Sequence, residues 1–140
     1  MKAELVDVGE NTMGWESPDI LIGIWRGEMT PAGMTAGFDK LKEFSKGWPR
    51  AFALVDVSGL TAIPLATRRV ANANVASVPF AATAVYGASF GIRTVFSLLV
   101  RAMSLVTSKP MTLGFFATEA EARAWIDVER ARIDAAEAKR

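Results

Sequence analysis

The stretch AFALVDV at residues 51–57 is apolar throughout except for Asp56. A continuous apolar run of this kind, without an alternating polar face, predicts a central strand that is covered on both faces. We therefore take residues 51–57 as the middle of the sheet, and the elements on either side of this strand as its neighbours.

Upstream of this strand the sequence predicts two short strands and one helix. β-rich runs at 5–8 and 20–25 are separated by a turn region at 9–14 that is rich in glycine and asparagine, which favours a hairpin or two edge strands. Thr30 followed by Pro31 predicts the start of a helix, because the threonine oxygen can cap it and the proline ring fits its first turn.

Downstream, helices and strands alternate. The expected elements are a helix at 64–75, a strand at 81–86, a helix at 89–107, a strand at 111–117 and a helix from 118 to the end. Such alternation implies a mostly parallel sheet with right-handed crossovers. The sequence predicts one α/β domain over residues 1–140, with a mixed, mostly parallel sheet of about four or five strands and about four helices.

The last helix changes in character along its length. Thr118 and Glu121 form a T-x-x-E capping box, which predicts where the helix begins. Beyond Ile126 the chain is a mixture of Ala, Glu and Arg with little apolar surface. We therefore expect a core over about 5–126 and a solvated helical extension at 127–140.

Composition excludes several kinds of chemistry. The 140 residues are 51% hydrophobic and 22% charged, which is typical of a soluble globular domain, and they include no Cys and no His. There is therefore no thiol nucleophile, thiolate metal site, imidazole base or usual zinc site. We expect no catalytic residue, no cofactor and no metal, and the net charge of +1 is too balanced for nucleic-acid binding.

The basic charge is concentrated in the middle of the chain. Residues 51–118 hold five basic residues and one acidic residue, Asp56, so this segment has a net charge of +4. Either a core-forming segment holds few charges of any kind, or it presents a face for an anion or an acidic partner.

Neither a targeting signal nor a membrane span is expected. The early acids Glu4 and Asp7 are unlike a signal peptide, so we expect a cytoplasmic protein. The uncharged stretch at 70–92 is interrupted by Asn72 and Pro79, so we expect no transmembrane segment there.

The pentapeptide GASFG at 87–91 matches G-x-S-x-G between a predicted strand and a predicted helix, the context of a hydrolase nucleophile elbow. We interpret the match as false, because the serine needs a base, the chain has no His, and Lys109 lies at the far end of the helix. Gly87 instead permits a tight turn and Ser89 caps the helix. The same helix start, with Arg93 one turn in, is also suited to hold an anionic group.

The helix at 89–107 carries more apolar surface than one sheet contact needs. Its polar residues gather within roughly 100° of arc, which leaves an apolar band about 220° wide. Either neighbouring helices cover the excess, or it meets a ligand, a second subunit or a membrane surface. The positions expected in the core are Phe96, Leu99 and Met103, and those expected at the margins, nearly neutral to stability, are Val100 and Leu105.

Residues 56–63, DVSGLTAI, close the buried strand and resemble the D-L-S-x-V-x-x-I stretch of STAS domains, the anti-sigma factor antagonist family typified by SpoIIAA. GEMT at 27–30 is similar to that superfamily's G-x-x-T step into its first helix. VYGASFGIR at 85–93 and FFATEAEARAWI at 115–126 resemble its SpoIIAA-like branch. The resemblance covers residues 5–126 and implies a SpoIIAA-like fold, which is shared with CRAL-TRIO lipid-binding domains.

The sequence departs from this family at the phosphoacceptor. In phosphorylated antagonists the isoleucine is followed by D-S-S-G or D-S-T-G, whose third residue takes phosphate from a kinase that is also the anti-sigma factor. Here Ile63 is followed by PLAT, so Ala66 stands at the acceptor position and Pro64 at the acidic one. Thr67, one residue further, substitutes only if the helix start is shifted. The resemblance therefore implies a STAS-like scaffold without the kinase-substrate function.

These observations favour a non-catalytic binding or regulatory module that acts through protein–protein interaction, near the N-termini of the helices that begin at about Pro64 and Ser89. The candidate binding residues are Ser58, Thr61, Thr67, Arg68, Arg69, Ser89 and Arg93. The alternative is a carrier or sensor of a small lipid-like or apolar anionic ligand, with an arginine at its headgroup. A second copy of the chain, forming a homodimer, is another candidate partner. An enclosed pocket would favour the carrier, and an exposed apolar patch a partner.

Overall fold

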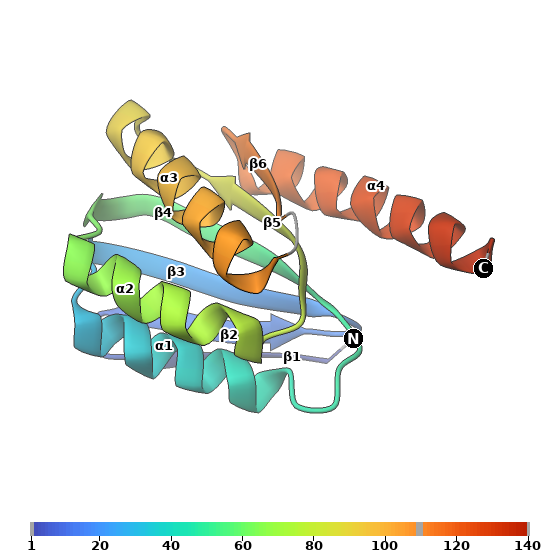
Figure 1. Cartoon of the computed structure of the whole chain (residues 1–140), viewed down its shortest axis with the longest axis horizontal. Helices are drawn as coiled ribbons and strands as arrows, with labels where there is room; N and C mark the ends of the chain where they lie inside the picture. The colour runs from blue at the N-terminus through green and yellow to red at the C-terminus, as the bar shows by residue number, and fades with distance from the viewer. Residues whose placement is uncertain (1, 109–110, 140) are drawn as a thin grey trace.

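Within the part of the chain that the structure describes, six strands form one sheet, with three helices on one face and a fourth on the other (Figure 1). The structure is a computed structural model and describes residues 2–108 and 111–139. In chain order the elements are β1 Ala3–Val8, β2 Asn11–Glu16, β3 Ile20–Glu28, α1 Pro31–Phe44, β4 Ala51–Ala62, α2 Leu65–Asn74, the short 3-10 helix η1 Val75–Ser77, β5 Phe80–Tyr86, α3 Phe90–Thr107, β6 Thr112–Phe116 and α4 Glu119–Ala138.

The strands lie in the sheet in the same order as in the chain, from β1 at one edge to β6 at the other. β1, β2 and β3 form an antiparallel meander, whereas β3, β4, β5 and β6 pair in parallel. The prediction of a mixed, mostly parallel α/β sheet is therefore confirmed, although six strands are present where about four or five were expected.

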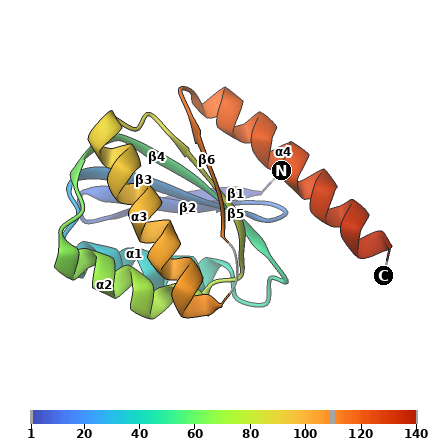
Figure 2. The same ribbon diagram turned by 45° about the horizontal axis from the view of Figure 1, so that its top comes forward.

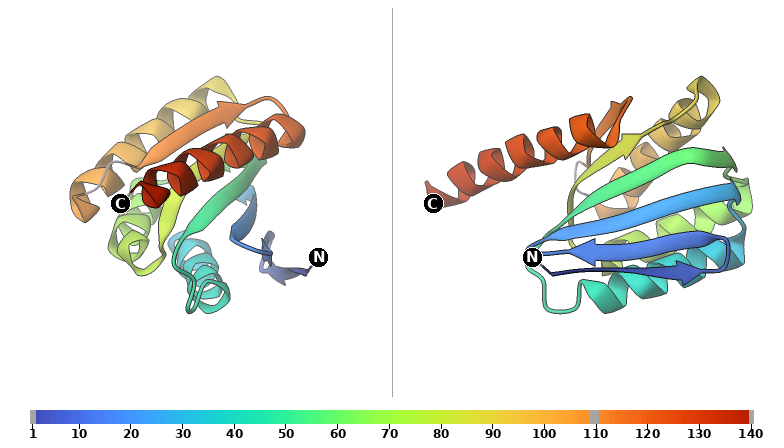
Figure 3. Two further views of the ribbon diagram at one scale, coloured as in Figure 1. Left: turned by 90° about the vertical axis from the view of Figure 1, so that its right-hand side faces the viewer. Right: turned by 180° about the vertical axis from the view of Figure 1, so that it is seen from behind.

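The helices are distributed unequally between the two faces. Because the strand order advances in one direction, right-handed crossovers place α1, α2 and α3 on the same face, where they lie side by side (Figure 2). α4 lies on the opposite face and contacts β4, β5 and β6. Among the described elements, no helix covers most of that face of β1, β2 and β3 (Figure 3).

β4 is buried on both faces along its first half, as its apolar run predicts. Ala53, Val55 and Val57 contribute to the core beneath α1, α2 and α3. Phe52 and Leu54, which point the other way, contribute to a second core cluster under α4. The strand therefore separates two apolar layers, and each layer needs its own helical cover.

α4 is attached to the sheet by apolar and charged contacts. Ile126 is fully buried in the second core cluster. Arg130 donates to both carboxylate oxygens of Asp19, at 2.6 and 3.0 Å, and its guanidinium carbon lies 5.3 Å from the centre of the Phe52 ring. The helix continues to Ala138, and the segment beyond Ile126 is mostly exposed but tied to the sheet by this arginine.

The expectation of a turn region at 9–14 was wrong, because most of it forms β2. Residues 12–16 pair with both β1 and β3. Gly14 is required there by a close approach between strands, since a Cβ atom would meet the Leu5 side chain and the Glu4 carbonyl oxygen. A glycine inside a strand can thus mark close packing, which composition alone does not distinguish from a turn.

α3 buries only part of its apolar band. Phe96, Leu99 and Met103 are buried as expected. Val100, which was expected at a margin, is also buried, whereas Leu105 at the other margin is 80% exposed. The helix is therefore rotated by about 50° from the orientation that would centre the band on the sheet. The surplus apolar surface lies along one side of the band and faces solvent.

These positions make a matched pair for mutation. Val100→Ser places a hydroxyl group in the core and removes apolar contacts, so we expect it to lower the free energy of unfolding by about 2 to 4 kcal/mol. Leu105→Ser should change it by less than about 0.5 kcal/mol, because the side chain is already in solvent. Urea unfolding followed by circular dichroism measures both, and equal losses would contradict the orientation of α3.

Candidate binding surface

The carboxyl ends of β4 and β5 and the first turns of α2 and α3 lie at one end of the molecule, on the left in Figure 1. The two strands are parallel neighbours, and their register pairs Asp56 with Tyr86. Gly87 follows with a φ of 77°, and a Cβ atom there would lie 2.9 Å from the Cβ atom of Ser58. Parallel sheets commonly place ligand and partner sites at this edge, outside the carboxyl ends of their strands.

Ser58 and Thr61 are exposed and form the strand side of this end of the molecule. The Ser58 N–H and hydroxyl groups both donate to the same oxygen of Asp56, at 2.9 and 2.7 Å. Because its one hydroxyl proton is used within the turn, Ser58 is left to act as an acceptor toward a binding partner.

Thr67 does not reach the surface. It is fully buried, and its hydroxyl group donates to the carbonyl oxygen of Met29 at 2.7 Å. α2 begins at Leu65, so Thr67 lies in its first turn and faces inward. Its structural role is to tie α2 to the segment between β3 and α1.

Three arginines have different surroundings at this end. Arg68 is half-buried, and its Nε donates to the carbonyl oxygen of Ile63 at 2.8 Å. Arg69 is exposed. Arg93 is also exposed, and its guanidinium carbon lies 5.4 Å from the centre of the Phe115 ring. Arg69 and Arg93 therefore present positive charge to solvent.

Ser89 is the N-cap residue of α3. Its hydroxyl oxygen accepts a hydrogen bond from the Ile92 N–H group at 3.2 Å. This is the structural interpretation of the GASFG motif, in which the serine stabilises a helix start.

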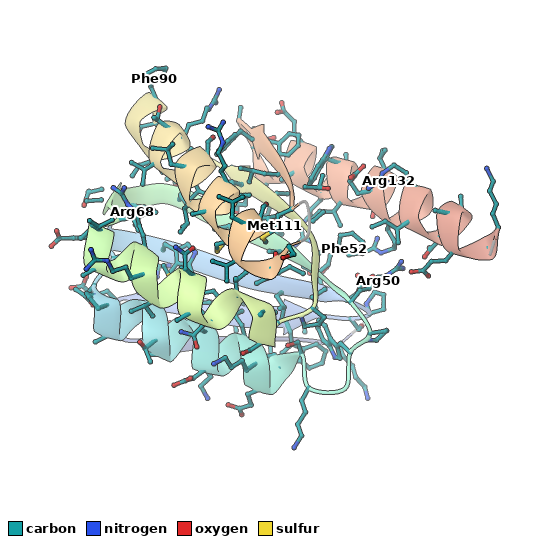
Figure 4. All side chains as sticks on the ribbon, viewed as in Figure 1. Arg50, Phe52, Arg68, Phe90, Met111 and Arg132 are labelled. Atoms are coloured by element: carbon teal, nitrogen blue, oxygen red, sulfur yellow. The ribbon has the colours of Figure 1, made fainter. Side chains whose placement is uncertain are left out.

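Two apolar residues at this end were missed by the sequence analysis. Leu65 and Phe90 are the first residues of α2 and α3, and their side chains are 59% and 87% exposed. Figure 4 shows Phe90 pointing away from the body of the protein. The signal was their position directly after the cap, outside the buried face of each helix. We define the carboxyl-end surface as Ser58, Thr61, Leu65, Arg68, Arg69, Ser89, Phe90 and Arg93.

Tyr86 lies at the same end of β5, in a network of charged side chains. Its hydroxyl group donates to Glu119 at 3.3 Å, and Glu119 also accepts from Arg123 at 2.8 Å. Partial burial, together with the negative charges of Asp56 and Glu119, raises the pKa of Tyr86 to about 12. At neutral pH this phenol is therefore a hydrogen-bond donor and not a base.

The core beneath α1, α2 and α3 contains an apolar cavity of about 80 Å³. Met13, Met29, Phe96 and Met103 are among its lining residues, and the Thr83 hydroxyl and the Trp25 indole N–H are the polar side-chain groups among its described lining residues. Ligand pockets usually measure about 300–1,000 Å³, so this cavity is far smaller than a lipid chain needs. Among the described residues, no cluster of three or more His, Cys, Asp or Glu side chains is placed to hold a metal ion.

No protein-family model matches the sequence, and no curated protein matches it. A solved structure does: an uncharacterised DUF3478-family protein from Shewanella loihica PV-4, described as having a SpoIIAA-like fold. The two structures align with a TM-score of 0.61 and 16% sequence identity, over 88% of this chain and 92% of the Shewanella chain. The chain has a SpoIIAA-like fold. The predicted SpoIIAA-like fold is thus confirmed, and the carboxyl-end surface lies at one end of that fold.

The inward position of Thr67 gives a first prediction for this SpoIIAA-like domain. Thr67→Val keeps the shape of the side chain but leaves the Met29 carbonyl oxygen buried without its donor, so it should lower the free energy of unfolding by about 1 to 3 kcal/mol. Thr61→Val, at an exposed strand position, is the control and should be nearly neutral. Chemical denaturation measures both, and an unchanged Thr67→Val protein would contradict the buried hydrogen bond.

A second prediction concerns Tyr86, which is the one tyrosine in the sequence. Because its pKa is raised to about 12, only about a tenth of it should ionise at pH 11, when a free tyrosine is mostly ionised. Stability should stay constant below about pH 10 and fall above it, as the unfolded chain loses this proton first. Absorbance at the tyrosinate band measures the ionised fraction of Tyr86 as the pH is raised. Glu119→Gln should lower the pKa, and a midpoint near 10 in the wild type would contradict the network.

Proposed function

We propose that this chain is a non-catalytic regulatory module that binds a protein partner through the carboxyl-end surface. The observation that carries the proposal is Phe90, a large aromatic side chain that is almost fully exposed on the same helix turn as Arg93. Aromatic residues, phenylalanine included, and arginine are enriched in the cores of protein interfaces. The SpoIIAA-like fold, which STAS regulatory modules share, supports the regulatory role.

The chemistry of the surface indicates what kind of partner fits it. The carboxyl-end surface includes Arg68, Arg69 and Arg93 and no acidic residue, and Asp56 on β4 is the one acid on the elements that supply it, so its net charge is positive. Charge complementarity favours an acidic protein surface as the partner. A symmetric second copy would oppose two surfaces of the same positive charge, which disfavours a homodimer through this surface.

The absence of catalysis is supported by the residues themselves. The chain contains no His or Cys, and the Ser89 hydroxyl oxygen is occupied as a helix cap. The Tyr86 phenol remains protonated at neutral pH because its pKa is raised to about 12. None of these groups is suited to act as a nucleophile or a general base.

A second candidate function is a carrier of a small apolar ligand, which the apolar cavity favours. Its volume of about 80 Å³ suits an occupant of a few heavy atoms, and its wall offers almost no polar group to orient an anion. We rank it second because a lipid-like ligand would have to displace core side chains. Native mass spectrometry of freshly purified protein separates the two functions: we expect the mass of the chain alone, and a retained small molecule would favour the carrier.

The protein-binding proposal is tested by photocrosslinking in cells that produce the chain. Phe90 is replaced by p-benzoylphenylalanine, which preserves an aromatic side chain at an exposed position, and Val128 on α4 is replaced in the same way as a control. We expect a discrete protein adduct from position 90 and none from position 128. Adding Arg69→Glu to the position-90 variant should lower the yield of the adduct by about tenfold, because this substitution reverses a charge of the carboxyl-end surface.

Two results would contradict the proposal. One is the same adducts from both positions, which indicates nonspecific contact. The other is an adduct at position 90 whose yield does not change when Arg69→Glu is added, since that places the partner elsewhere.

A further inference from the structure

Within residues 2–108 and 111–139, no helix or strand lies over the side of α3 that faces away from α2 and the sheet (Figures 1 and 2). With about 100° between consecutive residues, five positions fall within about 80° of arc on this side. We define this outer stripe as Phe90, Thr94, Leu98, Arg101 and Leu105, all of which are exposed or nearly so. It runs for about 22 Å along the helix, at 1.5 Å per residue.

The apolar members of the outer stripe are not explained by packing. The core side of α3 is filled by five buried residues, so Leu98 and Leu105 add nothing to the core, at 50% and 80% exposure. By length and composition alone, α3 is apolar enough to cross a membrane, but its inner side is packed on the sheet. The geometry is therefore that of a helix that lies flat on an interface with one side in the apolar phase.

Charge indicates which surface suits this side. Arg101 lies within the outer stripe and Arg93 lies beside it, and neither forms an ion pair with another described residue. The elements packed on α3 are α2, η1, β4 and β6, and Asp56 on β4 is their one acidic residue. Two exposed leucines with arginines beside them, and one acid on the neighbouring elements, are complementary to lipid tails beneath anionic headgroups.

We propose that the outer stripe of α3 docks on an anionic lipid surface, with Leu98 and Leu105 immersed and Arg101 at the headgroups. A lipid surface suits a stripe that is long and one residue wide, because lipids accommodate side chains without a complementary shape. A symmetric second copy would instead oppose two helix sides that both carry arginine and no acid. This goes beyond the proposed protein-binding function, because it assigns a ligand to the second half of α3.

The test is vesicle co-sedimentation of the full chain. Wild-type protein should bind vesicles of phosphatidylcholine mixed with phosphatidylglycerol, bind phosphatidylcholine alone much more weakly, and be released by high salt. Leu105→Ser should weaken binding by about tenfold, because it withdraws a leucine side chain from the apolar phase. Arg101→Glu should weaken it by about fivefold or more, because it removes one favourable charge and adds an unfavourable one.

Matched controls lie on α4, on the opposite face of the sheet. Val128→Ser removes an apolar side chain that is also mostly exposed, and Lys139→Glu, at the residue that follows α4, makes the same charge change as Arg101→Glu. Neither should change vesicle binding, and thermal melts confirm that all four variants fold. Phe90 belongs to both surfaces, so the two proposals are separated by their measurements: co-sedimentation uses the purified chain without a protein partner, and photocrosslinking at position 90 reports a protein adduct, to which a lipid contact does not contribute.

Three outcomes would overturn the proposal. In the first, the wild-type protein does not bind anionic vesicles. In the second, the α3 variants and the α4 controls lose binding equally. In the third, light scattering shows a dimer that Leu105→Ser dissociates. The last result would assign the outer stripe to a second copy of the chain.

Discussion

The rest of the fold depends on one constraint, which is that β4 has apolar side chains on both faces. Right-handed crossovers in a sheet whose order advances in one direction place α1, α2 and α3 on a single face. Phe52 and Leu54 on the opposite face would then be left in water. α4 removes this exposure, because it follows the last strand and lies back across β4, β5 and β6. The C-terminal helix is therefore part of the core structure.

The same constraint explains why α4 is attached by charge as well as by apolar contact. Asp19 is buried at the start of β3, where an unpaired carboxylate would be costly. Arg130 makes two short contacts to it, whereas Arg50 approaches only to 3.8 Å. Both guanidinium groups also lie over the ring of Phe52, at 5.3 and 5.5 Å. Docking of α4 thus covers the aromatic ring and balances the buried charge in one step.

Local sequence signals predicted most of the helices and strands. Features that depend on contacts between residues far apart in the sequence were not predicted. Thr30, Ser89 and Thr118 each cap the helix that they precede, as expected, because a cap depends on residues three positions away. The strand at β2 was missed because the need for Gly14 comes from a neighbouring strand. The spacing of apolar residues in α3 predicted the width of its apolar band. Which half of that band is buried depends on how α2 and β6 pack against the helix, and the spacing does not reveal this. For the same reason, the candidate surface was placed at the correct helix starts without Leu65 and Phe90.

Phe90 belongs to both the carboxyl-end surface and the outer stripe of α3, and this overlap has a functional consequence. On a helix, Phe90 and Leu105 lie within about 60° of each other, so a flat surface that takes one also covers the other. An acidic protein and an anionic membrane would both use the exposed arginines of α3, and Arg93 cannot serve both at once. The two proposed contacts are therefore mutually exclusive. A module built in this way would release its protein partner when it reaches an anionic membrane, which is a regulatory property that needs no phosphorylation at the position of Ala66.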